Sequence, residues 1–130
     1  MLERALIFLD LETTGAAAHS DRITEIGLME VDQGCHIGEW SSLVNPERPI
    51  PPLIESLTGI TDAMVAKAPT FAHLAPDLYQ RLDGKTLVAH NARFDYGFLQ
   101  SEFRRVGLKY APDVLCTVQV VPALLRIQAA

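Results

Sequence analysis

The chain has 130 residues, a formal net charge of −5, and a composition that is 48% hydrophobic and 21% charged. These values are typical of one globular domain, and they exclude a mostly disordered chain and binding of nucleic acid through a basic face alone. The apolar run at residues 5–9 is too short for a membrane span or a signal peptide, so we expect a cytoplasmic protein. Cys35 and Cys116 lack metal-ligand spacing and are expected to be buried free thiols.

The first part of the chain has the pattern of three strands joined by short connections. The nearly continuous apolar run at residues 5–11 is typical of a central buried strand. Residues 23–31 are expected to form a second strand, and the turn signal at 32–34 leads into a third at 36–44. These strands should form an antiparallel meander.

The second part alternates helical patterns with short strands. The expected helices are residues 53–57, 62–66, 71–82 and 92–106, and the expected strands are residues 86–89 and 114–116. Thr61, Thr70 and Asn91 should cap helices, and Pro76 should kink or delay the helix that contains it. Because strands reached through helical crossovers run parallel, the expected fold class is α/β, with a mixed five-stranded sheet flanked by helices.

Two acidic residues interrupt the first apolar run. Strand alternation places Asp10 and Glu12 on the same side, where neighbouring carboxylates repel unless a cation lies between them. A hard divalent ion such as Mg²⁺ or Mn²⁺ takes such oxygen ligands, and it would also invert the local field for nucleic acid. Taken alone, such a pattern more often represents two solvated acids at a strand end, since short motifs match often by accident.

Asp95 falls in the first turn of the helix expected after the strand at residues 86–89. The helix dipole alone favours an acid at that position. If the two strands are neighbours and parallel, however, their carboxyl ends are adjacent, and Asp95 projects toward Asp10.

Three motifs extend this pattern: LDLETTG at residues 9–15, LTGIT at 57–61 and VAHNARFD at 88–95. Together they resemble the DEDDh group of 3′–5′ exonucleases, above all the proofreading epsilon subunit of bacterial DNA polymerase III and its relatives. The resemblance covers residues 4–117 and implies a ribonuclease H-like fold. It also implies two-metal hydrolysis, with Mg²⁺ or Mn²⁺, that releases nucleoside 5′-monophosphates from single-stranded or frayed nucleic-acid 3′ ends. DNA is favoured over RNA as substrate, and DNA polymerase subunits are implied as partners.

The same resemblance assigns roles to single residues. Asp10, Glu12 and Asp95 are implied to be the catalytic residues and the metal ligands. For His90 and Phe94, packing and capping geometry are alternative roles. The substrate-binding residues that the resemblance implies are Leu11, Thr13, Thr14, Leu57, Thr58, His90, Asn91 and Phe94.

The family's third motif, H-x-A-x-x-D, supplies a general base and a fourth metal ligand. The sequence has no His after His90 and no Asp after Asp113. Residues 90–95 have the same spacing, but Asp95 already belongs to the second motif. We therefore expect a single exonuclease domain over residues 1–130 that is C-terminally incomplete relative to the family. The alternative is a catalytically incomplete nucleic-acid-binding or polymerase-associated module that retains the fold.

The last segment, residues 118–130, holds one charged residue, Arg126, and nine apolar residues among thirteen. Thr117 is expected to cap a helical piece there. Because exposed apolar side chains of this number are unfavourable, we expect the segment to pair with a second copy, most simply in a two-fold homodimer.

Overall fold

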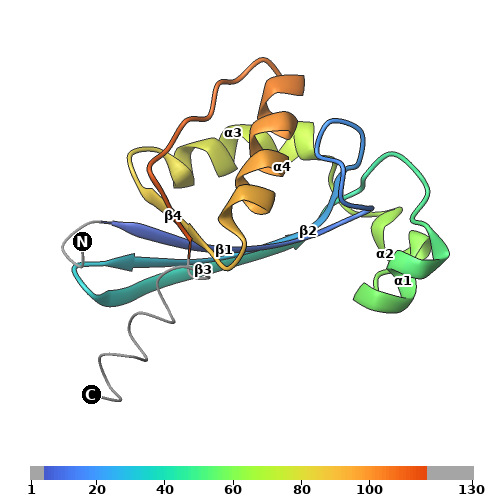
Figure 1. Cartoon of the computed structure of the whole chain (residues 1–130), viewed down its shortest axis with the longest axis horizontal. Helices are drawn as coiled ribbons and strands as arrows, with labels where there is room; N and C mark the ends of the chain where they lie inside the picture. Colours follow the sequence, from blue (N-terminus) through green and yellow to red (C-terminus); the bar gives the residue numbers. More distant parts are fainter. Residues whose placement is uncertain (1–4, 117–130) are drawn as a thin grey trace.

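The computed structural model describes residues 5–116, which form a five-stranded sheet with the order β3-β2-β1-β4-β5 (Figure 1). The strands are β1 (Leu6–Thr13), β2 (Ile23–Asp32), β3 (Cys35–Leu43), β4 (Thr86–Ala89) and β5 (Val114–Cys116). The helices are α1 (Pro52–Thr58), α2 (Asp62–Val65), α3 (Phe71–Leu82) and α4 (Ala92–Arg105). The helical piece expected after Thr117, and the dimer contact expected through residues 118–130, lie outside the described residues.

The pairing of the strands confirms the predicted mixed sheet. β1 pairs with β2, and β2 with β3, in antiparallel register, whereas β1 with β4 and β4 with β5 are parallel. The short turn between β2 and β3 permits only the antiparallel arrangement, and the helical connections return the chain in the parallel one. In the described part of the chain, no helix is long and apolar enough to cross a bilayer.

The hydrophobic core lies between one face of the sheet and helices α3 and α4, which cover the same side of it (Figure 1). Alternation along β1 sends Ile7, Leu9 and Leu11 into this core. The helices contribute apolar stripes at helical spacing: Phe71, Ala75, Leu78 and Leu82 from α3, and Phe98, Leu99 and Phe103 from α4. The even-numbered residues of β1 consequently point to the other face.

An aromatic cluster joins α3, α4 and the segment after α4. Phe103 is fully buried, and its ring meets those of Phe71, Tyr79 and Tyr110 at centroid distances of 5.0, 5.2 and 5.3 Å. These edge and tilted contacts are favourable ring geometries and add to the area that the rings bury. Phe103 is therefore the residue that ties the two covering helices together.

Three local expectations are wrong. Pro76 does not delay α3, which begins at Phe71 and includes Pro76 within its span to Leu82. Asn91 occupies the N-cap position of α4 without a side-chain capping bond, although Thr61 and Thr70 cap their helices as predicted. Of the two free cysteines, Cys35 is exposed beside the β2–β3 turn and Cys116 is half-buried.

Phe103→Ala should lower the free energy of unfolding by about 3–5 kcal/mol, because it removes three ring contacts and leaves a cavity between α3 and α4. Urea denaturation followed by circular dichroism measures this loss. Leu57→Ala is the matched control, since the Leu57 side chain is 74% exposed, and its change should stay within about 0.5 kcal/mol. Similar losses for both variants would contradict the assignment of the core.

Candidate active site

The difference in length between β1 and β4 creates the site. β4 ends at Ala89, opposite Leu9, whereas β1 continues to Thr13. The last residues of β1 therefore have no β4 neighbour. Asp10 and Glu12 lie in this extension and, by alternation, point away from the core side chains Leu9 and Leu11.

Asp95 comes to the same place from the other end of the chain. α4 begins directly after β4, and Asp95 lies in its first turn with only 7% of its surface exposed. Burial raises the pKa of Asp95 to about 7, and the nearby charges of Asp10 and then Glu12 add to the rise. The structure thus brings the three predicted carboxylates into electrostatic contact.

A fourth carboxylate, Glu25, was missed by the sequence reasoning. It pairs directly with Glu12 across β1 and β2, so the two like charges share one face of the sheet. Burial, then Asp10, then Glu25 raise the pKa of Glu12. Alternation along residues 23–31 was the available signal, because it places Glu25 opposite in face to the buried Ile26.

The chemistry of this donor set fits a hard divalent cation. Asp10, Glu12 and Asp95 are oxygen ligands whose negative charges oppose one another, a repulsion that Mg²⁺ or Mn²⁺ relieves. Within residues 5–116, however, no three His, Cys, Asp or Glu side chains are arranged to hold a metal ion. The carboxylates are therefore neighbours that do not converge on one point.

The motif after Glu12 builds the loop that follows β1. The Thr13 hydroxyl donates to the Gly15 carbonyl at 2.6 Å. Thr14 is 1% exposed, and its hydroxyl donates to Asp21 Oδ1 at 2.9 Å while accepting from the Arg22 amide at 3.0 Å. The Thr14 side chain is thus engaged in holding the loop together.

Leu57 and Thr58 lie on α1, and α1 and α2 sit at the end of the sheet toward which β1 runs (Figure 1). The Thr58 hydroxyl donates to the Ile54 carbonyl at 2.9 Å and accepts from the Ile60 amide at 3.2 Å, which closes the helix. Leu57 stays 74% exposed and offers a free apolar surface.

The remaining expected residues stand at the β4–α4 junction. His90 and Asn91 are exposed, and the His90 carbonyl accepts from Cys116 Sγ at 3.4 Å. Phe94 packs on the core, with its ring 4.8 Å from that of Phe98. The packing role considered for Phe94 therefore fits its position.

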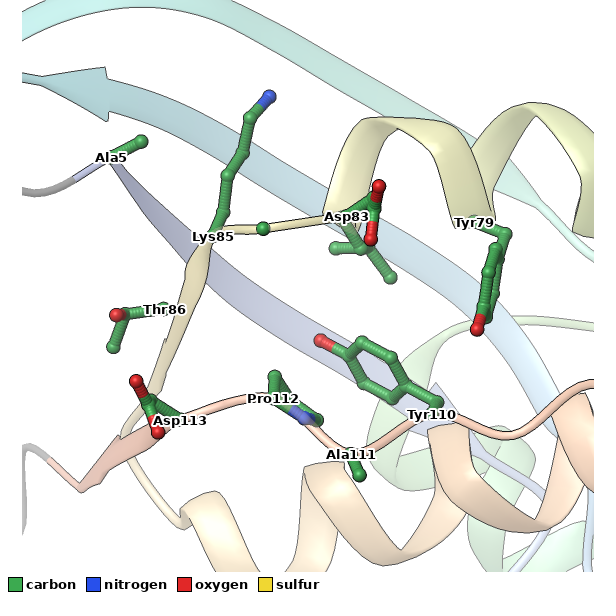
Figure 2. Close-up of a pocket in the computed structure, with 11 residues that line it drawn as sticks. Ala5, Tyr79, Asp83, Lys85, Thr86, Tyr110, Ala111, Pro112 and Asp113 are labelled. Carbon is green, nitrogen blue, oxygen red and sulfur yellow. The ribbon is translucent and has the colours of Figure 1, made fainter.

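A separate hollow lies at the opposite end of β1 and β4. Figure 2 shows Tyr110, Lys85 and Asp113 around it, between the end of α3, the start of β4 and the segment before β5. Burial, with a smaller contribution from Tyr96, raises the pKa of Tyr110. None of the expected site residues lines this hollow.

Comparisons with known proteins find matches among exonucleases. The exonuclease family model RNase_T matches residues 7–128. A Mycobacterium tuberculosis protein, provisionally named a bifunctional exonuclease/endonuclease, is 44% identical over 130 residues, covering 95% of this chain and 20% of its own length. The DNA polymerase III subunit epsilon of Treponema pallidum is 42% identical over 98 residues, covering 75% of this chain and 46% of its own.

The 3′-5′ exonuclease DinG of Bacillus subtilis is 37% identical over 123 residues, covering 92% of this chain and 13% of its own length. The chain thus spans less than half of each of these relatives. Among solved structures, Escherichia coli exonuclease I, in a complex with single-stranded DNA, matches with a TM-score of 0.84 and 21% identity. That match covers 92% of this chain and 29% of the other, and it confirms the predicted ribonuclease H-like fold.

Asp95→Asn should stabilise the protein at high pH and leave it unchanged at low pH. Because folding raises the pKa of Asp95 from 3.8 to about 7, its contribution to stability is full below pH 4 and is lost as the pH rises toward 7. At pH 8 without divalent ions, the variant should gain on the order of 2–4 kcal/mol in urea denaturation. Asp77→Asn, at an exposed carboxylate on α3, should show no such trend, and a flat difference for Asp95→Asn contradicts the site's electrostatics.

Proposed function

The chain belongs to the RNase_T exonuclease family, and on that premise we propose that it hydrolyses phosphodiester bonds at nucleic-acid 3′ ends and releases nucleoside 5′-monophosphates. The observation that carries the proposal is that Asp10 and Glu12, near the end of β1, are close enough to Asp95 in the first turn of α4 for their charges to raise its pKa. The epsilon and DinG relatives support the type of exonuclease and the direction of digestion.

In this proposal Asp10, Glu12 and Asp95 hold two Mg²⁺ or Mn²⁺ ions. When bound, such ions supply a nucleophilic water at neutral pH and stabilise the leaving 3′ oxygen. Leu57, which is exposed on α1, offers an apolar surface to the terminal base. Contacts of this kind tolerate any base, because every base has an apolar face. Such a face is accessible only when the terminal base is unstacked, so the proposed substrate is a single-stranded or frayed end.

The partners proposed are such a 3′ end, in DNA rather than RNA, and DNA polymerase subunits. The structural match to exonuclease I in a complex with single-stranded DNA and the epsilon relative support these two partners. The two-fold homodimer through residues 118–130 stays a prediction.

A second candidate function follows from the third motif. No His after His90 can act as its general base within these 130 residues. This observation favours a catalytically incomplete module that binds nucleic acid or a polymerase and retains the fold. The carboxylates favour the nuclease, because without metal ions they repel a phosphate backbone.

The chain should shorten a 5′-labelled single-stranded DNA from its 3′ end in Mg²⁺ and release mononucleotides. Loss of a general base costs about 10²–10⁴-fold, and the third-motif Asp is missing as well as the His, so the rate should fall below that of a relative with all three motifs by the upper end of this range or more. Asp10→Ala should abolish the reaction, and Asp77→Asn should not change it. Binding without any Mg²⁺-dependent cleavage would favour the second candidate, and a rate equal to the complete relative would contradict the role given to the missing His.

Mn²⁺ binding is a second and independent test of the site. Calorimetric titration of the wild type should show weak binding heats. Asp10→Ala should lose these heats, because the metal ion then has one carboxylate ligand fewer. Asp77→Asn should bind as the wild type does, since its exposed carboxylate pairs with Arg81 on α3. Equal heats for the wild type and Asp10→Ala would contradict the proposed metal site.

A further inference from the structure

We propose that Glu102 is a positioning residue for this reaction, which fixes the loop of residues 14–22 and thereby the end of β1. The proposal rests on the proposed function. Glu102 and Asp95 lie on the same buried stripe of α4, seven residues apart, which is two helical turns or about 10 Å. One face of one helix therefore carries a proposed metal ligand and the anchor of the neighbouring loop.

Glu102 is 1% exposed, yet both of its carboxylate oxygens are engaged. Oε1 accepts from Arg22 Nε at 2.9 Å and from Arg105 Nη1 at 3.0 Å. Oε2 accepts from the backbone amide of Ile23 at 3.1 Å. A buried carboxylate is costly unless it is paired in this way, so its place is tightly specified.

Arg105 binds the middle of the loop from α4. Its Nη2 donates to the carbonyls of His19 at 3.0 Å and Ala18 at 3.4 Å, while its Nη1 contacts Glu102. Glu102 and Arg105 thus hold the loop in its middle and at its exit into β2.

Hydrogen bonds within the loop connect its exit into β2 with the residues that follow β1. The Thr14 amide donates to the Arg22 carbonyl at 2.8 Å, and the Asp21 carboxylate bonds both the Thr14 hydroxyl and the Ala17 amide. Gly15 is needed for this closure, because a Cβ there would lie 2.4 Å from Asp21 Oδ2. The two ends of the loop are therefore joined by one set of hydrogen bonds.

The register of the sheet connects the loop to Glu12. Ile23, whose amide Glu102 binds, pairs with Thr13, and the β1–β2 register shifts between Glu12 and Thr13. At such an irregularity the ladder bonds do not fix the strand fully. Glu102 supplies the missing constraint one residue from a proposed ligand.

Stability alone does not account for this arrangement. Replacing a buried ion pair by apolar residues is often neutral or stabilising, so Arg22, Glu102 and Arg105 are not needed to fill the core. What the charged groups provide is geometry, since each bond has a fixed length and direction. Small displacements of catalytic groups reduce rates strongly.

The test compares Glu102→Gln with Asp77→Asn, a carboxylate that also pairs with an arginine but on the exposed side of α3. Both chains are assayed for Mg²⁺-dependent digestion of single-stranded DNA and for amide hydrogen exchange at a temperature where each is fully folded. Arg105→Lys is a milder second variant, because it keeps the charge beside Glu102 and loses the fork that reaches the loop carbonyls.

Glu102→Gln should lower kcat by about 10–100-fold with KM within about threefold, and should speed exchange of the Thr14, Ala17 and Ile23 amides while α3 stays protected. Arg105→Lys should show the same pattern more weakly. An unchanged kcat, or faster exchange spread evenly over the chain, would overturn the proposal. If the wild type has no nuclease activity, the proposed function fails, and selective exchange in the loop still decides whether Glu102 holds it.

Discussion

The parallel pairing of β1 with β4 determines where α4 begins relative to the end of β1. Leu6 pairs with Thr86 and Leu9 with Ala89, so the two strands run toward the same end of the sheet. Because β4 stops four residues before β1, α4 starts beside the unpaired extension of β1 and brings Asp95 to Asp10. A register shift of two residues would move these carboxylates apart by about 7 Å. Four backbone pairs thus bring together residues that lie far apart in sequence.

Helix α4 buries two carboxylates that meet opposite surroundings. Glu102 is neutralised by two arginines and a backbone amide, and it links distant segments. Asp95 faces Asp10 and Glu12, and burial and these charges both disfavour its ionised form. Burial alone is similar for both residues, so the partners decide the difference. The carboxylate of Glu102 is paired with opposite charges, whereas that of Asp95 faces like charges.

The sequence predicted the elements well, because apolar alternation, turn residues and caps are local signals. The delay expected from Pro76 does not occur, since packing of α3 on the core outweighs a local preference against helix. The role of Glu102 was not predicted, because its partner Arg22 lies 80 positions away and no local sequence pattern indicates the contact. The pairing of Glu25 with Glu12 depends on the β1–β2 register, which the sequence pattern of β2 does not specify. Asp10 and Asp95 could be placed together because alternation and parallel strand ends suffice for that.

The loop after β1 is held mainly through its backbone. Arg105 binds the carbonyls of Ala18 and His19, and Arg48 binds that of Ser20. Carbonyl oxygens are the same in every amino acid, so the exposed side chains of His19 and Ser20 can vary among descendants without loosening the loop, whereas Ala18 also packs against the core. Its length has no such freedom, because one residue more or fewer between Gly15 and Asp21 would carry every carbonyl out of reach. Evolution of this segment should therefore proceed by substitution, with insertions and deletions purged.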